Sequence, residues 1–118
     1  MGRDINQAGF QRGVMSLAIL ALLDKEEMYG YQMVQEILRI SSGSIVTQEG
    51  SLYPVLYKLV EQGLIADRKV LVGKRMTRVY YHIEPAGREQ LQKLIGEYEA
   101  TIQGVFRIIR WRNEHEDQ

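Results

Sequence analysis

Apolar residues recur at helical intervals in three segments of the first half of the chain. In residues 13–24 they lie on all sides of the helical wheel, which indicates burial on more than one side. Contact with a second subunit would bury part of this surface, and a core helix within one chain is the alternative. Residues 30–40 form an apolar stripe that ends at small turn residues, and residues 51–62 form another that ends at Gly63. The pattern therefore predicts three helices.

The start of the third helix is open between two positions. Pro54 cannot donate a helical hydrogen bond, so helix propensity places the start near Ser51, with Pro54 in the first turn. A start near Thr47, with a locally distorted turn at Pro54, is the alternative.

Beyond Gly63 the apolar pattern changes from helical to alternating. Residues 64–72 and 77–83 are rich in branched and aromatic side chains, which predicts a β-hairpin. Its tip, residues 73–76, is longer than a minimal hairpin turn. Pro85 then suits the first turn of a helix that we expect to run to about Arg112.

The last helix carries apolar residues at alternating intervals of four and three, a spacing that keeps one seam facing a partner helix. The seam consists of Leu91, Ile95, Tyr98, Ile102, Val105 and Ile109. We expect this seam, together with Leu17 of the first helix, to form a dimer interface.

The predicted elements divide the chain into four parts. These are a flexible or partly helical arm (1–12), a helical region with the hairpin (13–84), the long last helix (85–112) and a polar tail (113–118). The order helix, helix, helix, hairpin, helix is that of a winged helix-turn-helix, in which the third helix enters the DNA major groove. The expected fold is therefore mainly α with a β-hairpin: a winged helix-turn-helix followed by a C-terminal dimerisation helix.

Composition excludes several other classes of protein. The chain has 118 residues, of which 45% are hydrophobic and 25% charged, as in one globular domain. It has no cysteine, which excludes disulfides, a thiolate nucleophile and cysteine-ligated metals. The longest apolar run, residues 14–23, falls short of the roughly 20 residues of a membrane span, and no signal-peptide cleavage site follows it. We therefore expect a cytoplasmic protein.

Catalytic chemistry has no signature in the chain. The only histidines are His82 and His115, and no zinc-protease, nucleophile-elbow or phosphate-loop motif occurs. We expect His82 to be structural. The sequence thus predicts no catalytic residue, no metal ligand, no cofactor and no enzymatic activity.

The formal net charge is zero, from 15 basic and 15 acidic residues, which at first argues against a nucleic-acid partner. The distribution of the charges changes this interpretation. Residues 68–78 contain no acid and five cations, which are Arg68, Lys69, Lys74, Arg75 and Arg78. A locally cationic hairpin can bind phosphates although the whole chain is neutral. The alternative is a solvated hairpin whose cations only protect the sheet edge.

The polar side of the third helix offers further groups that can contact bases or phosphates. They are Ser51, Tyr53, Tyr57 and Lys58. For Tyr53, a core position with a satisfied hydroxyl group is the alternative. Glu49 would repel phosphate, which favours a role in selecting a base or in ordering Lys58.

Four segments together resemble the PadR family of bacterial transcriptional regulators. They are YGYQM (29–33), EGSLYPVLYKL (49–59), EQGLI (61–65) and RVYYHIEPAGREQL (78–91). Each segment is weak by itself, but their order and spacing make the resemblance specific. With RGVMSLAILALL (12–23) it covers roughly residues 12–110 and is closest to a compact subgroup with a single C-terminal dimerisation helix.

The resemblance implies a homodimer that represses genes by binding a pseudo-palindromic double-stranded operator. Such a protein acts in the bacterial cytoplasm and is associated with the nucleoid when it binds DNA. Many members release DNA on binding a phenolic or multidrug-like effector. The resemblance also implies that the third helix extends back toward Thr47, with Pro54 inside it.

Site residues carry over from the family by position. Ser51, Tyr53 and Tyr57 match DNA-facing residues of the recognition helix. Tyr29 and Tyr31 match positions near phosphates at the start of the second helix, and Lys74 and Arg75 match the wing tip. Lys58, near the polar side of the third helix, and Arg78, one of the hairpin cations, complete the expected DNA-binding residues.

The effector site rests on one position. Some compact members stack flat aromatic drugs on a tryptophan at the dimer interface, and Tyr98 aligns with that tryptophan; plain packing in the seam is the alternative. We expect Trp111, which lies among three arginines, to make a dimer contact at the helix end. A rival function is a winged-helix dimer that serves in protein interaction or ligand sensing without binding DNA.

Overall fold

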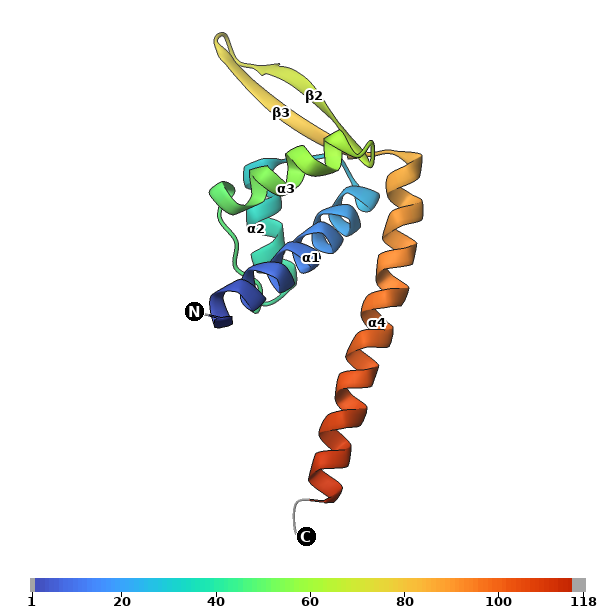
Figure 1. The fold of residues 1–118 in the computed structure, drawn as a ribbon. Helices are drawn as coiled ribbons and strands as arrows, with labels where there is room; N and C mark the ends of the chain where they lie inside the picture. The colour runs from blue at the N-terminus through green and yellow to red at the C-terminus, as the bar shows by residue number, and fades with distance from the viewer. Residues whose placement is uncertain (1, 116–118) are drawn as a thin grey trace.

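The computed structural model describes the backbone of residues 2–115 and the side chains of residues 13–115. Within these residues the elements are α1 (Gly2–Lys25), β1 (Met28–Tyr29), α2 (Gly30–Ile40), α3 (Glu49–Glu61), β2 (Ile65–Val72), β3 (Met76–Ile83) and α4 (Pro85–Glu114) (Figure 1). This is the expected mainly helical winged helix-turn-helix with a long last helix. Residues 116–118 of the predicted tail lie outside the described residues.

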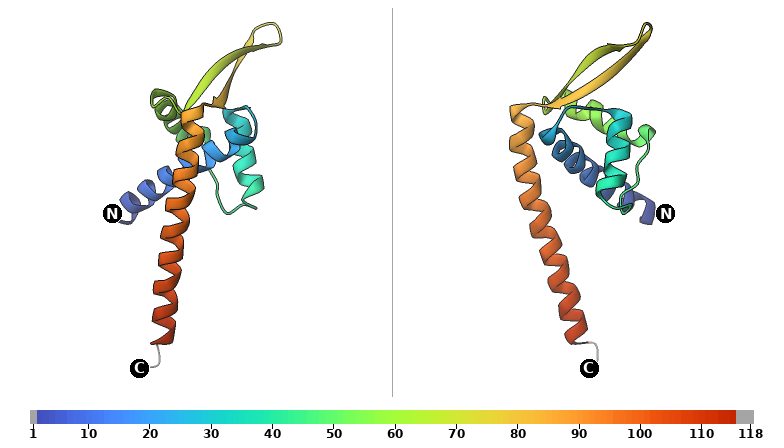
Figure 2. Two further views of the ribbon diagram at one scale, coloured as in Figure 1. Left: turned by 90° about the vertical axis from the view of Figure 1, so that its right-hand side faces the viewer. Right: turned by 180° about the vertical axis from the view of Figure 1, so that it is seen from behind.

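The molecule is elongated, with extents of 70 × 29 × 26 Å. Helices α1 to α3 and the sheet form a body at one end, and α4 leaves this body and diverges from α1 along its length (Figures 1 and 2). The β2–β3 hairpin projects from the body away from the C-terminal end of α4 (Figure 1). The wing and the free part of α4 therefore lie at opposite ends of the molecule.

The core forms where the apolar stripes of the three helices meet the inner face of the sheet. Its fully buried side chains are Ile19, Leu20, Met33, Leu52, Leu56 and Ile65. Helix α1 packs against α2, α3, α4 and β3, which accounts within one chain for the apolar residues on several of its sides. Leu17 and Leu22 are only partly buried, so some apolar surface of α1 is left over.

The sheet has the strand order β1-β3-β2 and is antiparallel throughout. The pairing of Val72 with Met76 leaves Gly73, Lys74 and Arg75 as the hairpin loop, so the tip is longer than a minimal turn, as predicted. Gly73 has a φ of +75°, a left-handed conformation that glycine adopts without steric cost. The strand β1 was not predicted, because two residues are too few to show an alternating pattern.

Helix α1 begins earlier than its pattern predicts, and α4 ends slightly later. Helix α1 begins at Gly2 rather than at Gly13, because residues 2–12 contain no proline and glycine costs a helix only about 1 kcal/mol. Residues 2–12 of the predicted arm are thus the first part of α1, and residue 1 lies outside the described residues. Helix α4 begins as expected and ends at Glu114, slightly beyond Arg112.

Helix α3 begins at Glu49, between the two predicted starts, and Pro54 lies inside its second turn. The backbone N–H groups of Ser51 and Leu52 both donate to the carbonyl oxygen of Gln48, each at 3.0 Å, which fixes the first turn. Pro54 leaves the Gly50 carbonyl without its helical donor. Because Gly50 is exposed, water can replace that donor, so propensity alone placed the start too late.

Candidate nucleic-acid interface

The outer face of α3 is polar because the leucines of this helix point inward. Leu52, Leu56 and Leu59 are buried against the core, whereas Ser51 is exposed and the Tyr57 side chain is 62% exposed. Tyr57 therefore presents its ring and hydroxyl to solvent from the middle of the helix. This is the geometry that a recognition helix needs to bring side chains to base edges.

Tyr53 lies between α3 and the start of α2 and is half-buried. Its ring stacks on that of Tyr57, with centroids 6.0 Å apart, and its hydroxyl donates to Glu49 Oε1 at 3.5 Å. Burial, followed by the nearby Glu49 carboxylate, raises the pKa of Tyr53. A Cβ atom at Gly30 would lie only 2.6 Å from the Tyr53 hydroxyl oxygen. The ring is thus held in place by Gly30, Glu49 and Tyr57.

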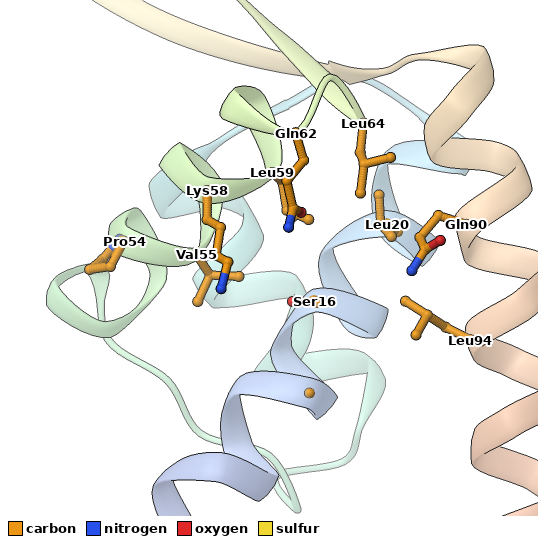
Figure 3. A pocket seen from close by; sticks show the side chains of 11 residues that line it. Ser16, Leu20, Pro54, Val55, Lys58, Leu59, Gln62, Leu64, Gln90 and Leu94 are labelled. Atoms are coloured by element: carbon orange, nitrogen blue, oxygen red, sulfur yellow. The ribbon is translucent and has the colours of Figure 1, made fainter.

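Glu49 therefore contacts Tyr53, and it does not order Lys58 as the sequence suggested. The two residues lie on opposite sides of α3, because nine residues correspond to two and a half helical turns. Lys58 lines a hollow of about 660 Å³ between α3, α1 and α4, together with Gln62 of α3 and Gln90 of α4. Figure 3 shows the Lys58 side chain directed from α3 toward this hollow. Lys58 is thus on the flank of the helix, away from Tyr57.

The outer face of the sheet carries a row of aromatic and cationic side chains. Tyr29 and Arg68 both pair with Tyr80 across the strands, so all three side chains share one face. The Tyr29 and Tyr80 rings meet edge to face at 5.4 Å. Arg78 Cζ lies 4.0 Å from the Tyr29 ring centroid, and Arg68 Cζ lies 5.8 Å from that of Tyr80. Cation–π contact therefore orders two of the five hairpin cations.

Arg68 also forms an ion pair with Glu27, which lies just before β1. Its hydrogen bond lowers the pKa of Glu27, and the same contact raises the pKa of Arg68. His82 Nε2 lies 3.0 Å from Glu84 Oε1, and His82 Nδ1 lies 4.0 Å from Glu27 Oε2. Residues 68–78 contain no acid, and Glu27, far away in the sequence, provides one to Arg68 through the fold.

The remaining hairpin cations are exposed. Lys69, Lys74 and Arg75 form no ion pair with any described residue, and the last two occupy the tip of the projecting hairpin. Tyr31, in the first turn of α2, is also 51% exposed. These groups are free to meet phosphates.

Tyr81 is a neighbour of the candidate site that the sequence did not indicate. It is buried, and burial, followed by the nearby Tyr57 and Tyr53 groups, raises its pKa to about 12. The Tyr81 phenol therefore lies near the Tyr53–Tyr57 pair. Its position on the inner face of β3 was the available signal, because the alternation of β3 makes Tyr81 and Ile83 inward neighbours.

The predicted seam of α4 is buried only at its start. Leu91 is buried and Ile95 and Ile102 are partly buried, whereas Tyr98, Val105 and Ile109 are exposed by 37%, 46% and 41%. Leu17, Tyr98 and Ile102 line a hollow of about 300 Å³ between α1 and α4. Trp111 is 60% exposed and lies on the opposite side of α4 from Ile102, nine residues away. Trp111 is thus not part of the seam.

Two further observations concern the described residues alone. None of their histidine, aspartate and glutamate side chains form a group of three or more that could hold a metal ion. No helix within residues 2–115 is both long enough and apolar enough to cross a membrane.

The chain is similar to known proteins in sequence and in fold. The model of the family described as "Transcriptional regulator PadR-like family" matches residues 19–93. The chain is 38% identical over 82 residues to the transcriptional regulator Rv3488 of Mycobacterium tuberculosis, a match that covers 70% of this chain and 73% of that protein. It spans only 33% of the length of two other curated relatives and 80% of a third.

Two solved structures are similar over most of the chain. A transcriptional regulator from Clostridium thermocellum superposes with a TM-score of 0.76 and 27% identity, covering 84% of this chain and 93% of that one. Bacillus subtilis PadR in complex with operator DNA superposes with a TM-score of 0.66 and 27% identity, covering 70% of this chain and 46% of that one.

Proposed function

Because the chain belongs to the PadR-like family of transcriptional regulators, we propose that it is a repressor that binds a pseudo-palindromic DNA operator as a homodimer. Members of this family are transcriptional regulators and not enzymes. The observation that carries the proposal is the position of the exposed polar face of α3 beside a projecting hairpin with cations at its tip. A regulator of this kind acts on the chromosome, in the bacterial cytoplasm.

Residues 13–84 form the DNA-binding part of the proposed repressor. Helix α3 enters the major groove, where Ser51 and Tyr57 contact base edges and Tyr53 supports Tyr57. Lys74 and Arg75 bind phosphates beside the groove, and Lys58 reaches the backbone from the flank of α3.

The start of α2 and the sheet supply a second set of phosphate contacts. Tyr29 and Tyr31 donate their hydroxyl groups to phosphate oxygens. Arg78 stacks on Tyr29 at 4.0 Å, so it holds that ring in position and adds positive charge beside it.

Residues 85–112 form the dimerisation helix. The exposed seam of α4 and the partly buried Leu17 of α1 give an apolar surface that continues along the helix beyond the body. A second copy would cover this surface with the same residues, because a two-fold interface is self-complementary. The two α3 helices would then enter successive major grooves about 34–36 Å apart.

A small aromatic or phenolic effector is the last part of the proposal. The hollow of about 300 Å³ beside Tyr98 lies at the edge of the proposed dimer interface. A flat ring that stacks on Tyr98 there would favour one spacing of the two α3 helices over another, which is the condition for releasing DNA. Packing of Tyr98 in the seam, without a ligand, is the alternative.

Salt-dependent DNA binding tests the proposal. We expect Lys74→Ala with Arg75→Ala to weaken binding to the operator and to lower the slope of log affinity against log salt by up to about two for each wing. Lys93→Ala with Arg107→Ala removes the same charge from exposed positions on α4 and should leave the slope unchanged. Equal affinities and slopes for both double variants would favour a module for protein interaction or ligand sensing without DNA binding.

A further inference from the structure

The end of α3 and the start of α4 meet at the Leu64 peptide. The N–H of Leu64 donates to the carbonyl oxygen of Leu59, in the last turn of α3, at 3.0 Å. The carbonyl oxygen of Leu64 accepts from the N–H of Glu84, the residue before α4, at 2.9 Å. One residue thus ties the recognition helix to the base of the long helix.

Side-chain packing does not fill the space between α3 and α4 below this point. The hollow of about 660 Å³ lies there, with Leu64 at one end and Gln90 and Leu94 of α4 on its wall (Figure 3). The angle between the two helices is therefore set by the Leu64 joint and by the packing of both helices on α1.

Gly87, in the first turn of α4, makes the close approach at this joint possible. A Cβ atom at position 87 would lie 2.1 Å from the Leu64 carbonyl oxygen and 2.7 Å from Ile83 Cγ1. The Leu64 oxygen is a backbone atom held by a hydrogen bond, so it cannot move aside as a flexible side chain would. A Cβ atom at Gly96, on the same helix, would meet nothing within 4 Å.

We infer that Gly87 is the positioning residue that sets the angle at which α4 leaves the winged helix. Through that angle it sets the distance between the two recognition helices of the dimer and the half-site spacing that the protein accepts. This inference rests on the proposed function, because it requires α4 to carry the dimer interface.

The geometry gives the size of the effect. Relief of the 2.1 Å contact requires a movement of about 1 Å, and Leu91, the buried anchor of α4, lies one turn away, about 6 Å along the axis. A pivot at Leu91 would therefore tilt α4 by about 10° and displace Ile109, about 27 Å further on, by roughly 4 Å. In the dimer, where the interface holds α4, the same tilt turns each body and its α3 helix about Leu91, which changes the spacing of the two α3 helices on the scale of one base-pair step, roughly 3.4 Å.

A distance between spin labels tests the inference without DNA. The chain has no cysteine, so Glu61→Cys, at an exposed position at the end of α3, introduces a single labelling site in each protomer. We expect pulsed electron paramagnetic resonance to give one narrow distance in the labelled dimer. Adding Gly87→Ala should shift the mean distance, because a tilt of about 10° in each protomer turns the two α3 helices relative to each other, and adding Gly96→Ala should leave it unchanged. A folded, dimeric Gly87→Ala protein with the original distance overturns the inference.

The same variants can be compared on DNA. Duplexes selected by the unsubstituted protein from a random library would be rebuilt with the spacer between half-sites changed by one or two base pairs. We expect Gly87→Ala to move the preferred spacer by about one base pair, with the affinity for a single half-site kept within about twofold. An unchanged spacer preference contradicts the inference, whereas failure of the unsubstituted protein to dimerise or to select a palindrome counts against the proposed function.

Pro85→Gly provides a second variant if Gly87→Ala does not fold. It keeps Gly87 but frees the φ angle of the first residue of α4, which proline fixes. Because the Gly87–Leu64 contact is kept, we expect the label distance and its width to stay as in the unsubstituted dimer. A broader distribution would show that Pro85, and not Gly87, holds the angle and would overturn the inference.

Discussion

At the scale of single residues, the exposed Tyr57 ring is held in place by its neighbours. Gly30 leaves room for the Tyr53 ring, Glu49 accepts the hydrogen bond of its hydroxyl, and the ring then stacks on Tyr57. The exposed Tyr57 ring is therefore ordered before any ligand arrives, which reduces the conformational entropy lost on binding.

We expect Gly30→Ala to destabilise the protein by about 1–3 kcal/mol, because its Cβ atom would overlap the Tyr53 hydroxyl and displace the ring. Operator affinity should fall as well, since Tyr57 loses its stacking partner. Urea unfolding and DNA titration measure the two effects. Gly96→Ala, whose Cβ atom meets no neighbour, is the control and should cost no stability.

Glu27 limits the positive charge that the hairpin offers to DNA, because it pairs with Arg68. We expect Glu27→Gln to free Arg68 and to steepen the slope of log affinity against log salt by about one for each wing that gains a phosphate contact. Titrations of one operator duplex at several salt concentrations provide the measurement. An identical slope in both proteins would mean that Arg68 never reaches a phosphate.

The same ion pair makes a pH-dependent contribution to stability. Arg68 lowers the pKa of Glu27 below its ordinary value of 4.5 in the folded protein. The stabilisation is therefore present above that ordinary value and is lost as the pH falls through the lowered one. Thermal melting should separate the unsubstituted protein from Glu27→Gln at neutral pH and bring them together in acid. A difference that persists at low pH would point to a role of Glu27 other than its charge.

At the scale of secondary-structure elements, the seam of α4 has a direct test. We expect Ile102→Glu to give monomers in analytical ultracentrifugation, because dimerisation would bury an unpaired charge in the seam. Lys93→Glu changes an exposed residue on the opposite side of the helix and should leave the dimer intact. A dimer that survives Ile102→Glu would place the interface on another surface.

Some secondary-structure elements could be predicted from the periodicity of the sequence, whereas others depend on tertiary contacts. The limits of α2 and the β-hairpin follow from periodicity, because each element has enough residues to show its repeat. The strand β1 exists only through its pairing with β3, and its two residues show no repeat of their own. Likewise, the start of α3 depends on how the structure tolerates Pro54, which helix propensity treats as a first-turn residue.

The candidate site residues divide in the same way, into those predicted from local sequence and those brought together only by the fold. Exposure of Tyr57 and of the hairpin tip could be predicted, because both follow from local periodicity and turn position. The pairing of Arg68 with Glu27 could not, since 41 residues separate them and only the fold brings them together. The close approach of Gly87 to Leu64 could not be predicted either, because it depends on the path of α4 past the end of α3.

At the scale of the whole molecule, dimerisation should link stability to concentration. If the folded dimer unfolds to separate chains, each tenfold rise in protein concentration stabilises it by about 1.4 kcal/mol. We therefore expect the melting temperature to rise by about 3–5 °C for each tenfold rise, measured by circular dichroism. A melting temperature that stays constant over two decades of concentration would describe a protein whose folding does not depend on a partner.

The position of α4 in the chain also has a consequence for biosynthesis. The ribosome completes residues 13–84 before α4 emerges, and protein domains generally fold as units during synthesis, from the N-terminus onward. The exposed apolar face of α4 thus leaves the ribosome after residues 13–84, when the body to which it is attached can already have its native shape. Chains made close together from one messenger RNA would then meet through this face soon after release, which shortens the time in which chaperones or proteases encounter it.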